Sequence, residues 1–323
     1  MTQALVLGGT GWLSGRIAQH WRDAGADVTC LGRGARPAPE GTLLLRGERD
    51  DADVFDDLRR REWDQVIDIS SRADHVRSAV ETLGPVAARW TYISSVSVYS
   101  DDATIGADES APRYAPAQPG DDYDYGPQKV AAEDAVRALG DRAAIVRPGL
   151  IVGTGDVSDR FGYWAAAFAR AGSDPVLIPP TAGRGAQVID VDDVAAFALI
   201  APAGRAVNAV GDQHPLGEVL QRIRTAAGHT GEVVEGPDAW LEAQGVNHWM
   251  GEHSLPLWLP DDMPGFTTHS NAAYRAAGGT LLPLDDTIAD VLADERARGL
   301  DRERRSGLSR AEELGLLSAL DEG

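Results

Sequence analysis

Lysine is nearly absent from this chain of 323 residues: the 30 basic residues include a single lysine, Lys129, and are otherwise arginines. Cysteine is equally scarce, because Cys30 stands alone and excludes an internal disulfide. Its apolar neighbours predict a thiol buried in a strand. Basic residues are also outnumbered by acidic ones, since 30 basic and 50 acidic residues give a net charge of −20. Nucleic acids and anionic membranes are bound by basic faces, so neither is an expected partner.

Long apolar runs are missing as well. None approaches the roughly 20 residues that a membrane-spanning helix requires. A predicted strand begins by about Gln3, which leaves no room for a signal peptide, so we expect a cytoplasmic protein. Even the histidine-bearing stretch 247–253 lacks the spacing of a typical metal site, and no metal is expected.

What the chain does contain is an alternation of short apolar runs with helical patterns. Strands buried on both faces of a parallel sheet read as continuous apolar runs. We therefore predict an α/β fold with a doubly wound parallel sheet of the Rossmann type. The predicted strands lie at about residues 4–7, 27–31, 43–45, 65–69, 91–94 and 144–146.

The alternation loosens in the second half of the chain, which predicts a division into two parts. We assign residues 1–155 to a dinucleotide-binding Rossmann domain that is rejoined by about 186–210. Residues 156–185 and 211–323 then form a smaller C-terminal substrate lobe with terminal helices. In the tail, Ser309-Arg310-Ala311-Glu312 has the pattern of a capping box that opens a last helix.

A glycine-rich segment, Gly8-Gly9-Thr10-Gly11, follows the first predicted strand and precedes a helical pattern. At such a turn, backbone amides and the helix N-terminus can bind a pyrophosphate. The dinucleotide fingerprint has a third glycine, and Ser14 stands in its place as a small residue that can fit. We predict cofactor contacts from Gly8, Thr10, Gly11, Trp12 and Leu13.

The residues after the second predicted strand indicate which dinucleotide binds. A carboxylate there would bond the ribose hydroxyls of NAD, whereas an arginine suits the additional phosphate of NADP. Arg33 and Arg36 occupy this segment, and the first acidic residue is Glu40. The pattern favours NADP(H) over NAD(H), although two solvated loop arginines would look the same.

The lone lysine lies four residues after Tyr125, so a helix would place the ammonium one turn from the phenol. The planar fork of arginine does not reproduce a compact ammonium. A cation about 4 Å away could lower the phenol pKa by up to roughly 3 pH units, toward the range of general acid–base catalysis. Taken alone, the pair is equally well a surface charge that happens to lie near a tyrosine.

Several segments, in this order, resemble the extended short-chain dehydrogenases/reductases, the NAD-dependent epimerase/dehydratase family. They are the glycine segment, Ser94-Ser95-Val96-Ser97-Val98-Tyr99, Tyr125 with Lys129, and residues 147–153 and 189–194. The resemblance implies that Ser95, Tyr125 and Lys129 are catalytic, with Ser94 as the fallback for Ser95. In this interpretation Tyr125 exchanges the proton, Ser95 bonds the substrate oxygen, and Lys129 also bonds the nicotinamide ribose.

The same resemblance implies further contacts and a possible homodimer formed through the helix that carries Tyr125. Glu48 and Arg49 would lie near the adenine, Ser70 beside the ribose, and Pro148 and Ile151 near the carboxamide. Candidates to face the substrate are Tyr99, Asp156, Arg160, Trp164 and Gln187.

Two departures from the family pattern restrict the function. Val96 and Ser97 stand where sugar-nucleotide 4,6-dehydratases carry an acidic pair, and Leu150 where sugar-nucleotide epimerases often carry asparagine. We therefore expect an oxidoreductase that transfers a hydride between NADP(H) and a carbonyl or alcohol of a small molecule, with Tyr125 as acid/base. The alternatives are an NAD(P)-dependent epimerase, with sugars and sugar nucleotides among its candidate substrates, and a non-catalytic dinucleotide-sensing or RNA-binding relative.

Overall fold

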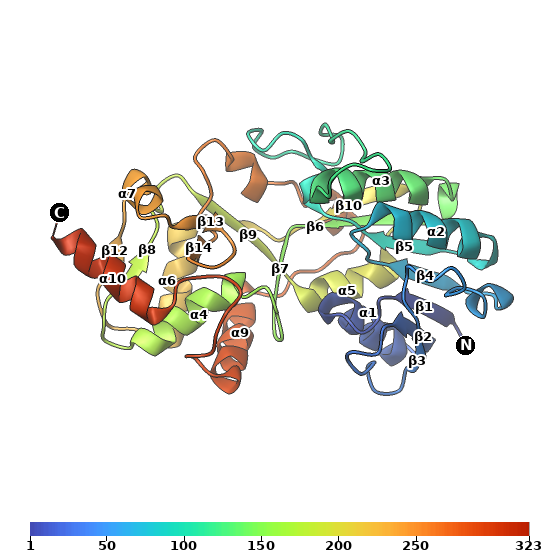
Figure 1. Ribbon diagram of the computed structural model, residues 1–323, viewed down its shortest axis with the longest axis horizontal. Coiled ribbons are helices and arrows are strands. Elements are labelled where there is room, and N and C mark those ends of the chain that lie inside the picture. The colour runs from blue at the N-terminus through green and yellow to red at the C-terminus, as the bar shows by residue number, and fades with distance from the viewer. Residues whose placement is uncertain (323) are drawn as a thin grey trace. The chain divides into compact units, whose positions relative to one another are not determined.

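The computed structural model describes residues 1–322 and divides the chain into two compact units (Figure 1). Unit 1 comprises Met1–Ile151, Val191–Gly211 and His269–Leu281. Unit 2 comprises Val152–Asp190, Asp212–Thr268 and the chain from Leu282 onward. No helix in the described part of the chain combines the length and apolar character that crossing a membrane requires.

A seven-stranded sheet, parallel throughout, forms the centre of unit 1 and confirms the predicted doubly wound fold. Its strand order is β10-β6-β5-β4-β1-β2-β3. The inner strands are buried on both faces, as their apolar sequences require, whereas Leu43 on the edge strand β3 is 50% exposed. The strands are β1 (Gln3–Leu7), β2 (Asp27–Gly32), β3 (Leu43–Arg46), β4 (Gln65–Asp68), β5 (Trp90–Ile93), β6 (Ala143–Pro148) and β10 (Arg205–Ala209).

Helices cover both faces of this sheet (Figure 1). On one face α1 (Trp12–Asp23) packs against α5 (Val191–Ile200), and on the other α2 (Ala73–Leu83) packs against α3 (Tyr125–Arg137). The four short 3-10 helices of this unit are η1 (Leu58–Arg60), η2 (Gly84–Val86), η3 (Val96–Val98) and η4 (Gly140–Arg142).

The sheet order reverses between β1 and β4, because the chain runs from β1 toward β3 and then returns to β4 on the other side. In open α/β sheets a ligand crevice lies at such a switch point, outside the carboxyl ends of the strands. The loops after β1, β2, β4 and β5 meet at this edge and carry the glycine-rich segment, Arg33, Ser70 and Ser95.

The segment His269–Leu281 belongs to unit 1, together with the parallel sheet. Its helix α8 (Ala272–Ala276) packs beside β10. The ring of Tyr274 is fully buried 4.5 Å from the ring of Phe197, and its hydroxyl donates to the carbonyl of Thr280 at 2.6 Å. The contact between Tyr274 and Phe197 joins residues far apart in sequence, so no local pattern predicts it.

Unit 2 is built on three helices that pack together: α4 (Arg160–Ala171), α6 (Leu216–Ala227) and α9 (Leu284–Arg298). The predicted capping box is present at α10 (Arg310–Asp321), where the Glu312 amide donates to Ser309 Oγ at 3.3 Å and the Ser309 amide donates to Glu312 Oε2 at 2.7 Å. The remaining elements are β7 (Leu150–Val152) at the boundary, β8 (Val176–Ile178), β9 (Gly185–Asp190), β11 (Gln213–Pro215), β12 (Val233–Glu235), α7 (Asp238–Ala243), β13 (Asn247–Trp249), β14 (Ser254–Pro256) and η5 (Pro264–Thr267).

Candidate active site

The glycine-rich loop joins β1 to α1 and is closed by Ser14, the residue that replaces the third glycine of the fingerprint. Ser14 Oγ donates to the Gly8 carbonyl at 2.5 Å and accepts from the Gly11 amide at 3.1 Å. Gly9 lies so close to β2 that a Cβ there would stand 2.6 Å from the sulfur of Cys30, which is fully buried as predicted. The loop is therefore compact, and its amides lie at the N-terminus of α1, where an anion is stabilised.

A cavity of about 630 Å³ lies in unit 1 beside this loop. Its size and its donors, loop amides and arginines, fit the adenosine and phosphate groups of a dinucleotide. Seven residues predicted to contact the cofactor line it: Gly8, Thr10, Gly11, Arg33, Arg36, Glu48 and Arg49. Trp12 lines a smaller neighbouring cavity together with Thr10 and Gly11, and Leu13 is buried under the loop.

The arginines of the cavity differ in how firmly the protein holds them. Arg49 donates to both carboxylate oxygens of Asp68, at 3.1 and 2.9 Å, and to the carbonyl of His75 at 2.5 Å. Arg33 and Arg36 are exposed on the loop after β2. Arg49 is therefore fixed in the wall of the cavity by its own hydrogen bonds, whereas the exposed guanidinium groups of Arg33 and Arg36 can bind a ligand.

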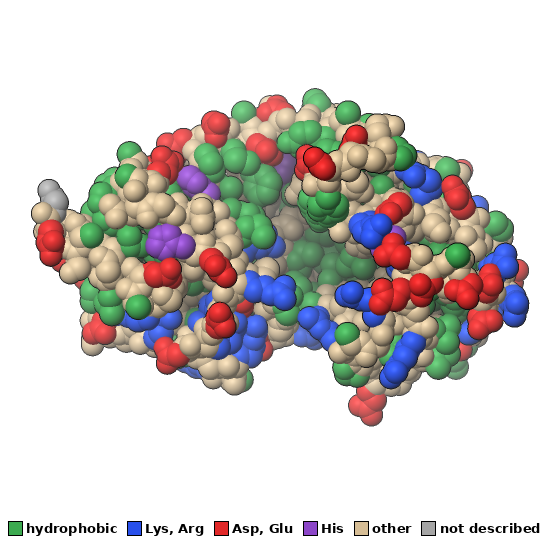
Figure 2. Space-filling view, in the orientation of Figure 1, with side chains coloured by type: hydrophobic (Ala, Val, Ile, Leu, Met, Phe, Trp, Pro, Cys, Tyr) green, Lys and Arg blue, Asp and Glu red, His purple; other side chains and the backbone are tan. Residues whose placement is uncertain are grey.

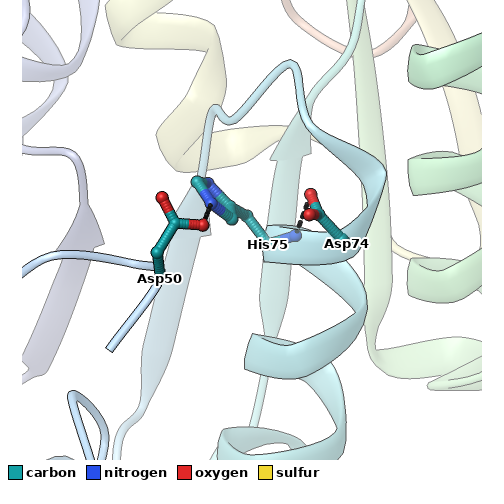
Figure 3. A group of neighbouring side chains, drawn as sticks. All are labelled: Asp50, Asp74 and His75. Carbon is teal, nitrogen blue, oxygen red and sulfur yellow. Dashed lines mark hydrogen bonds and ion pairs between the residues drawn. The ribbon is translucent and has the colours of Figure 1, made fainter. Parts of the chain in front are cut away.

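Asp50 and His75 line the same cavity, and together with the neighbouring Asp74 they could reach one metal ion (Figure 3). His75 Nε2 lies 2.9 Å from Asp50 Oδ1, and Arg72 forms ion pairs with Asp50 at 3.3 Å and with Asp74 at 2.6 Å. The hydrogen bond from His75 holds the pKa of Asp50 below its ordinary value, and Arg72 does the same for Asp74.

The Arg72 guanidinium already supplies the positive charge between these carboxylates, so we interpret the cluster as an exposed ion-pair network. Acidic and basic side chains are also intermixed over the face of the protein that Figure 2 shows. The absence of a metal stays a prediction.

Lys129 is buried, with 2% of its surface exposed, and its ammonium bonds three backbone carbonyls. Nζ lies 2.7 Å from the carbonyl oxygen of Ile93, 3.1 Å from that of Ser70 and 3.4 Å from that of Ile69. Burial lowers the pKa of Lys129 to about 7, against the opposing effect of Asp68 and Glu133. The one lysine of the chain thus ties α3 to the ends of β4 and β5.

Tyr125 and Ser95 lie on two elements that are in close contact. Tyr125 opens α3, is 41% exposed, and has its ring centroid 5.9 Å from Lys129 Nζ. At the next residue, Gly126, a Cβ would stand 2.6 Å from the carbonyl oxygen of Ser97, so glycine lets α3 approach η3. Ser95 caps η3, and its Oγ accepts from the Ser97 amide at 3.1 Å. The structure brings the predicted catalytic residues to one edge of the sheet.

Among the other predicted residues, Ser70 meets this group through its carbonyl, which accepts from Lys129, and most of the rest lie inside the protein. In unit 1, Ser70 and Ile151 are half-buried and Pro148 ends β6. Tyr99 is 1% exposed, and its hydroxyl donates to Asn208 and accepts from Arg147.

In unit 2, Trp164 is fully buried, and its indole donates to the carbonyl of Pro256 at 2.8 Å. Asp156 and Gln187 are buried as well. Arg160 lies over the ring of Trp249 at 5.4 Å. Substrate contact stays a prediction for all of these candidates.

Three residues of the site were not predicted. Gly126 was visible as a glycine inside a helix, which costs about 1 kcal/mol relative to alanine and so suggests a packing reason. Asp68 and Tyr92 gave no sequence signal, because an acid or a tyrosine at a strand end is ordinary. Their importance lies in contacts with Arg49, Ser70 and Lys129 that only the fold creates.

A model of the NAD dependent epimerase/dehydratase family matches residues 4–210, which include the glycine loop, Ser95, Tyr125 and Lys129. The chain therefore belongs to this family. A search of curated proteins found no match. Membership in the family supports an NAD-dependent enzyme with a nicotinamide dinucleotide cofactor.

Several solved structures, epimerases among them, have the same fold as this family member. A candidate epimerase from Burkholderia cenocepacia J2315 is 24% identical over 92% of this chain and 98% of its own, with a TM-score of 0.71. The UDP-Glc/GlcNAc 4-epimerase from Campylobacter jejuni is 14% identical over 92% and 100%, with a TM-score of 0.70. The Bordetella bronchiseptica enzyme WbmG, solved with NAD and UDP, is 17% identical over 92% and 94%, with a TM-score of 0.67.

Proposed function

We propose that this protein is an NADP(H)-dependent oxidoreductase that interconverts a carbonyl and an alcohol on a small molecule. The observation that carries the proposal is the convergence of Tyr125, Lys129 and Ser95 at the edge of the sheet where the dinucleotide-sized cavity opens. A buried ammonium beside an exposed phenol suits proton exchange with a bound substrate.

Each group of residues in the site would have a separate role in the proposed reaction. The glycine loop, Arg33 and Arg36 would hold the cofactor, which supplies hydride chemistry when bound. Tyr125, exposed at the start of α3, would give a proton to the substrate oxygen or take it in the reverse direction. Lys129 would stabilise the tyrosinate by its charge, and Ser95 Oγ would bond and orient the substrate oxygen.

An epimerase is the second candidate, favoured by the family and by the solved epimerases with the same fold. The two functions differ in how the cofactor is used, because an epimerase returns the hydride to the carbon that released it. With NADPH and a panel of carbonyl compounds, an oxidoreductase consumes one NADPH for each product molecule. With NAD+ or NADP+ and a panel of UDP-sugars, isomer formation without net gain of NAD(P)H absorbance would establish the epimerase instead.

The choice of cofactor is tested at the loop after β2. Arg33→Ala should weaken NADPH binding by roughly 10- to 100-fold, the range for a lost charge-assisted hydrogen bond, and leave NADH binding within about twofold. Titrations followed by NAD(P)H fluorescence give both dissociation constants. Arg60→Ala, an exposed arginine of η1, is the matched control. Equal loss for NADPH and NADH, or no loss, would contradict the assignment of the 2′-phosphate to Arg33.

A further inference from the structure

Tyr92 lies beneath the proposed catalytic group and has no assigned role. It belongs to β5, three residues before Ser95, and is fully buried. Its hydroxyl donates to the carbonyl oxygen of Ser70 at 2.9 Å. Burial raises the pKa of Tyr92 well above its ordinary value, so the phenol stays protonated and acts as a donor.

The same carbonyl also accepts a hydrogen bond from Lys129. Nζ lies 3.1 Å from the Ser70 oxygen, and a carbonyl has two lone pairs, so both donors are accommodated. Nζ also lies 4.8 Å from the centroid of the Tyr92 ring, within the range of a cation–π interaction. Tyr92 thus touches the ammonium with its ring and holds one of the ammonium's acceptors with its hydroxyl.

The Ser70 peptide needs such support because it follows the end of β4 and lies outside regular structure. Its amide donates to Asp68 Oδ1 at 3.0 Å, and Asp68 is held in turn by Arg49. The Ser70 amide is therefore held by the Asp68–Arg49 ion pair, and the Ser70 carbonyl is held by Tyr92 and Lys129.

We propose that Tyr92 is a positioning residue for Lys129: its ring face supports the ammonium, and its hydroxyl fixes the carbonyl that the ammonium bonds. The catalytic use of Lys129 rests on the proposed function, but the positioning itself does not. The other charged or titratable groups that face Lys129 are Asp68 from β4 and Tyr125 and Glu133 from α3. None of them is altered in the experiment that follows.

The single lysine makes a direct measurement practicable. Protein grown with lysine carrying 13C at Cε gives one side-chain signal, from Lys129, whose pH titration yields its midpoint without cofactor or substrate. Tyr92→Phe keeps the ring, and pentafluorophenylalanine at the same position keeps its shape but reverses the charge distribution of its face. We expect the fluorinated ring to lower the midpoint by about one pH unit relative to Tyr92→Phe. Equal midpoints would overturn the role of the ring.

The hydroxyl is tested by amide hydrogen exchange in residues 69–72. Tyr92→Phe should speed exchange there by about two- to tenfold, the effect of one lost hydrogen bond. Tyr99→Phe is the matched control, because Tyr99 is a buried phenol of the same unit whose hydroxyl bonds Asn208 instead. Unchanged exchange in Tyr92→Phe would remove the hydroxyl from the proposal. A shifted midpoint with unaltered NADPH binding and turnover would uphold the positioning and count against the catalytic use of Lys129.

Discussion

Lys129→Arg should lower turnover by about 100- to 10,000-fold, the range for loss of general acid–base catalysis, although the positive charge is kept. The three carbonyl oxygens around Nζ lie 2.7 to 3.4 Å away in a buried site, a geometry that suits a compact ammonium. A guanidinium is larger and planar, and its five donors cannot all be satisfied there. It would displace the ends of β4 and β5 or turn away from Tyr125.

The measurement is the rate of NADPH consumption, or of isomer formation, with whichever substrate the panel identifies. Tyr125→Phe should show a loss of the same order, because it removes the hydroxyl whose proton transfer Lys129 is proposed to assist. Arg137→Lys makes the reverse exchange at a more exposed position of the same helix and should stay near wild type. If Lys129→Arg retained a third or more of the activity, Lys129 would have no catalytic role, and its spacing from Tyr125 in the sequence would be a coincidence.

Breaking the Glu133–Arg147 ion pair should destabilise the protein by about 3–5 kcal/mol. Arg147 donates to the two oxygens of Glu133 at 2.8 and 2.7 Å, and the side chains are 1% and 0% exposed. Burial would raise the pKa of Glu133, but the hydrogen bonds and charge of Arg147 outweigh it and hold that pKa below its ordinary value. Without Glu133, the buried guanidinium of Arg147 would lose its carboxylate partner. Without Arg147, Glu133 would lose its buried partner and keep only the more exposed Arg113 and Arg137.

Urea unfolding of Glu133→Gln and Arg147→Met measures this cost. Glu133→Leu combined with Arg147→Met should recover a large part of it, since two apolar side chains leave no buried charge. Arg60 pairs with Asp57 on the surface, and Arg60→Ala should cost less than about 1 kcal/mol. Single variants that lose no more than Arg60→Ala would show that this buried pair contributes little.

The sequence was most informative where a local pattern determines the structure. Apolar runs such as 4–7 and 65–69 predicted the strands of the sheet, because burial on both faces leaves few polar positions. The glycine loop was recognisable between a strand and a helix, and Ser14 fills the place of its missing glycine. The spacing of Tyr125 and Lys129 placed both on one helix, as α3 has them.

What the sequence did not reveal depends on distant parts of the chain. Nothing near Lys129 indicates that its partners are carbonyls from two strand ends, because their directions are set by the sheet. The segment His269–Leu281 lies in unit 1, where Tyr274 packs against Phe197, a residue more than seventy positions earlier in the sequence. Tyr99, expected near the substrate, has its hydroxyl engaged by Asn208 and Arg147 inside unit 1.

The burial of the single lysine has a practical consequence for the chemistry of the whole surface. Reagents that acylate amines usually modify many lysines of a protein, but here Lys129 is 2% exposed and the chain has no other. The folded protein should therefore react almost entirely at its α-amino group, which permits attachment of a dye or a solid support at one end. The slow rate at which Lys129 is acylated would then measure how often its ammonium leaves the carbonyls of Ile69, Ser70 and Ile93.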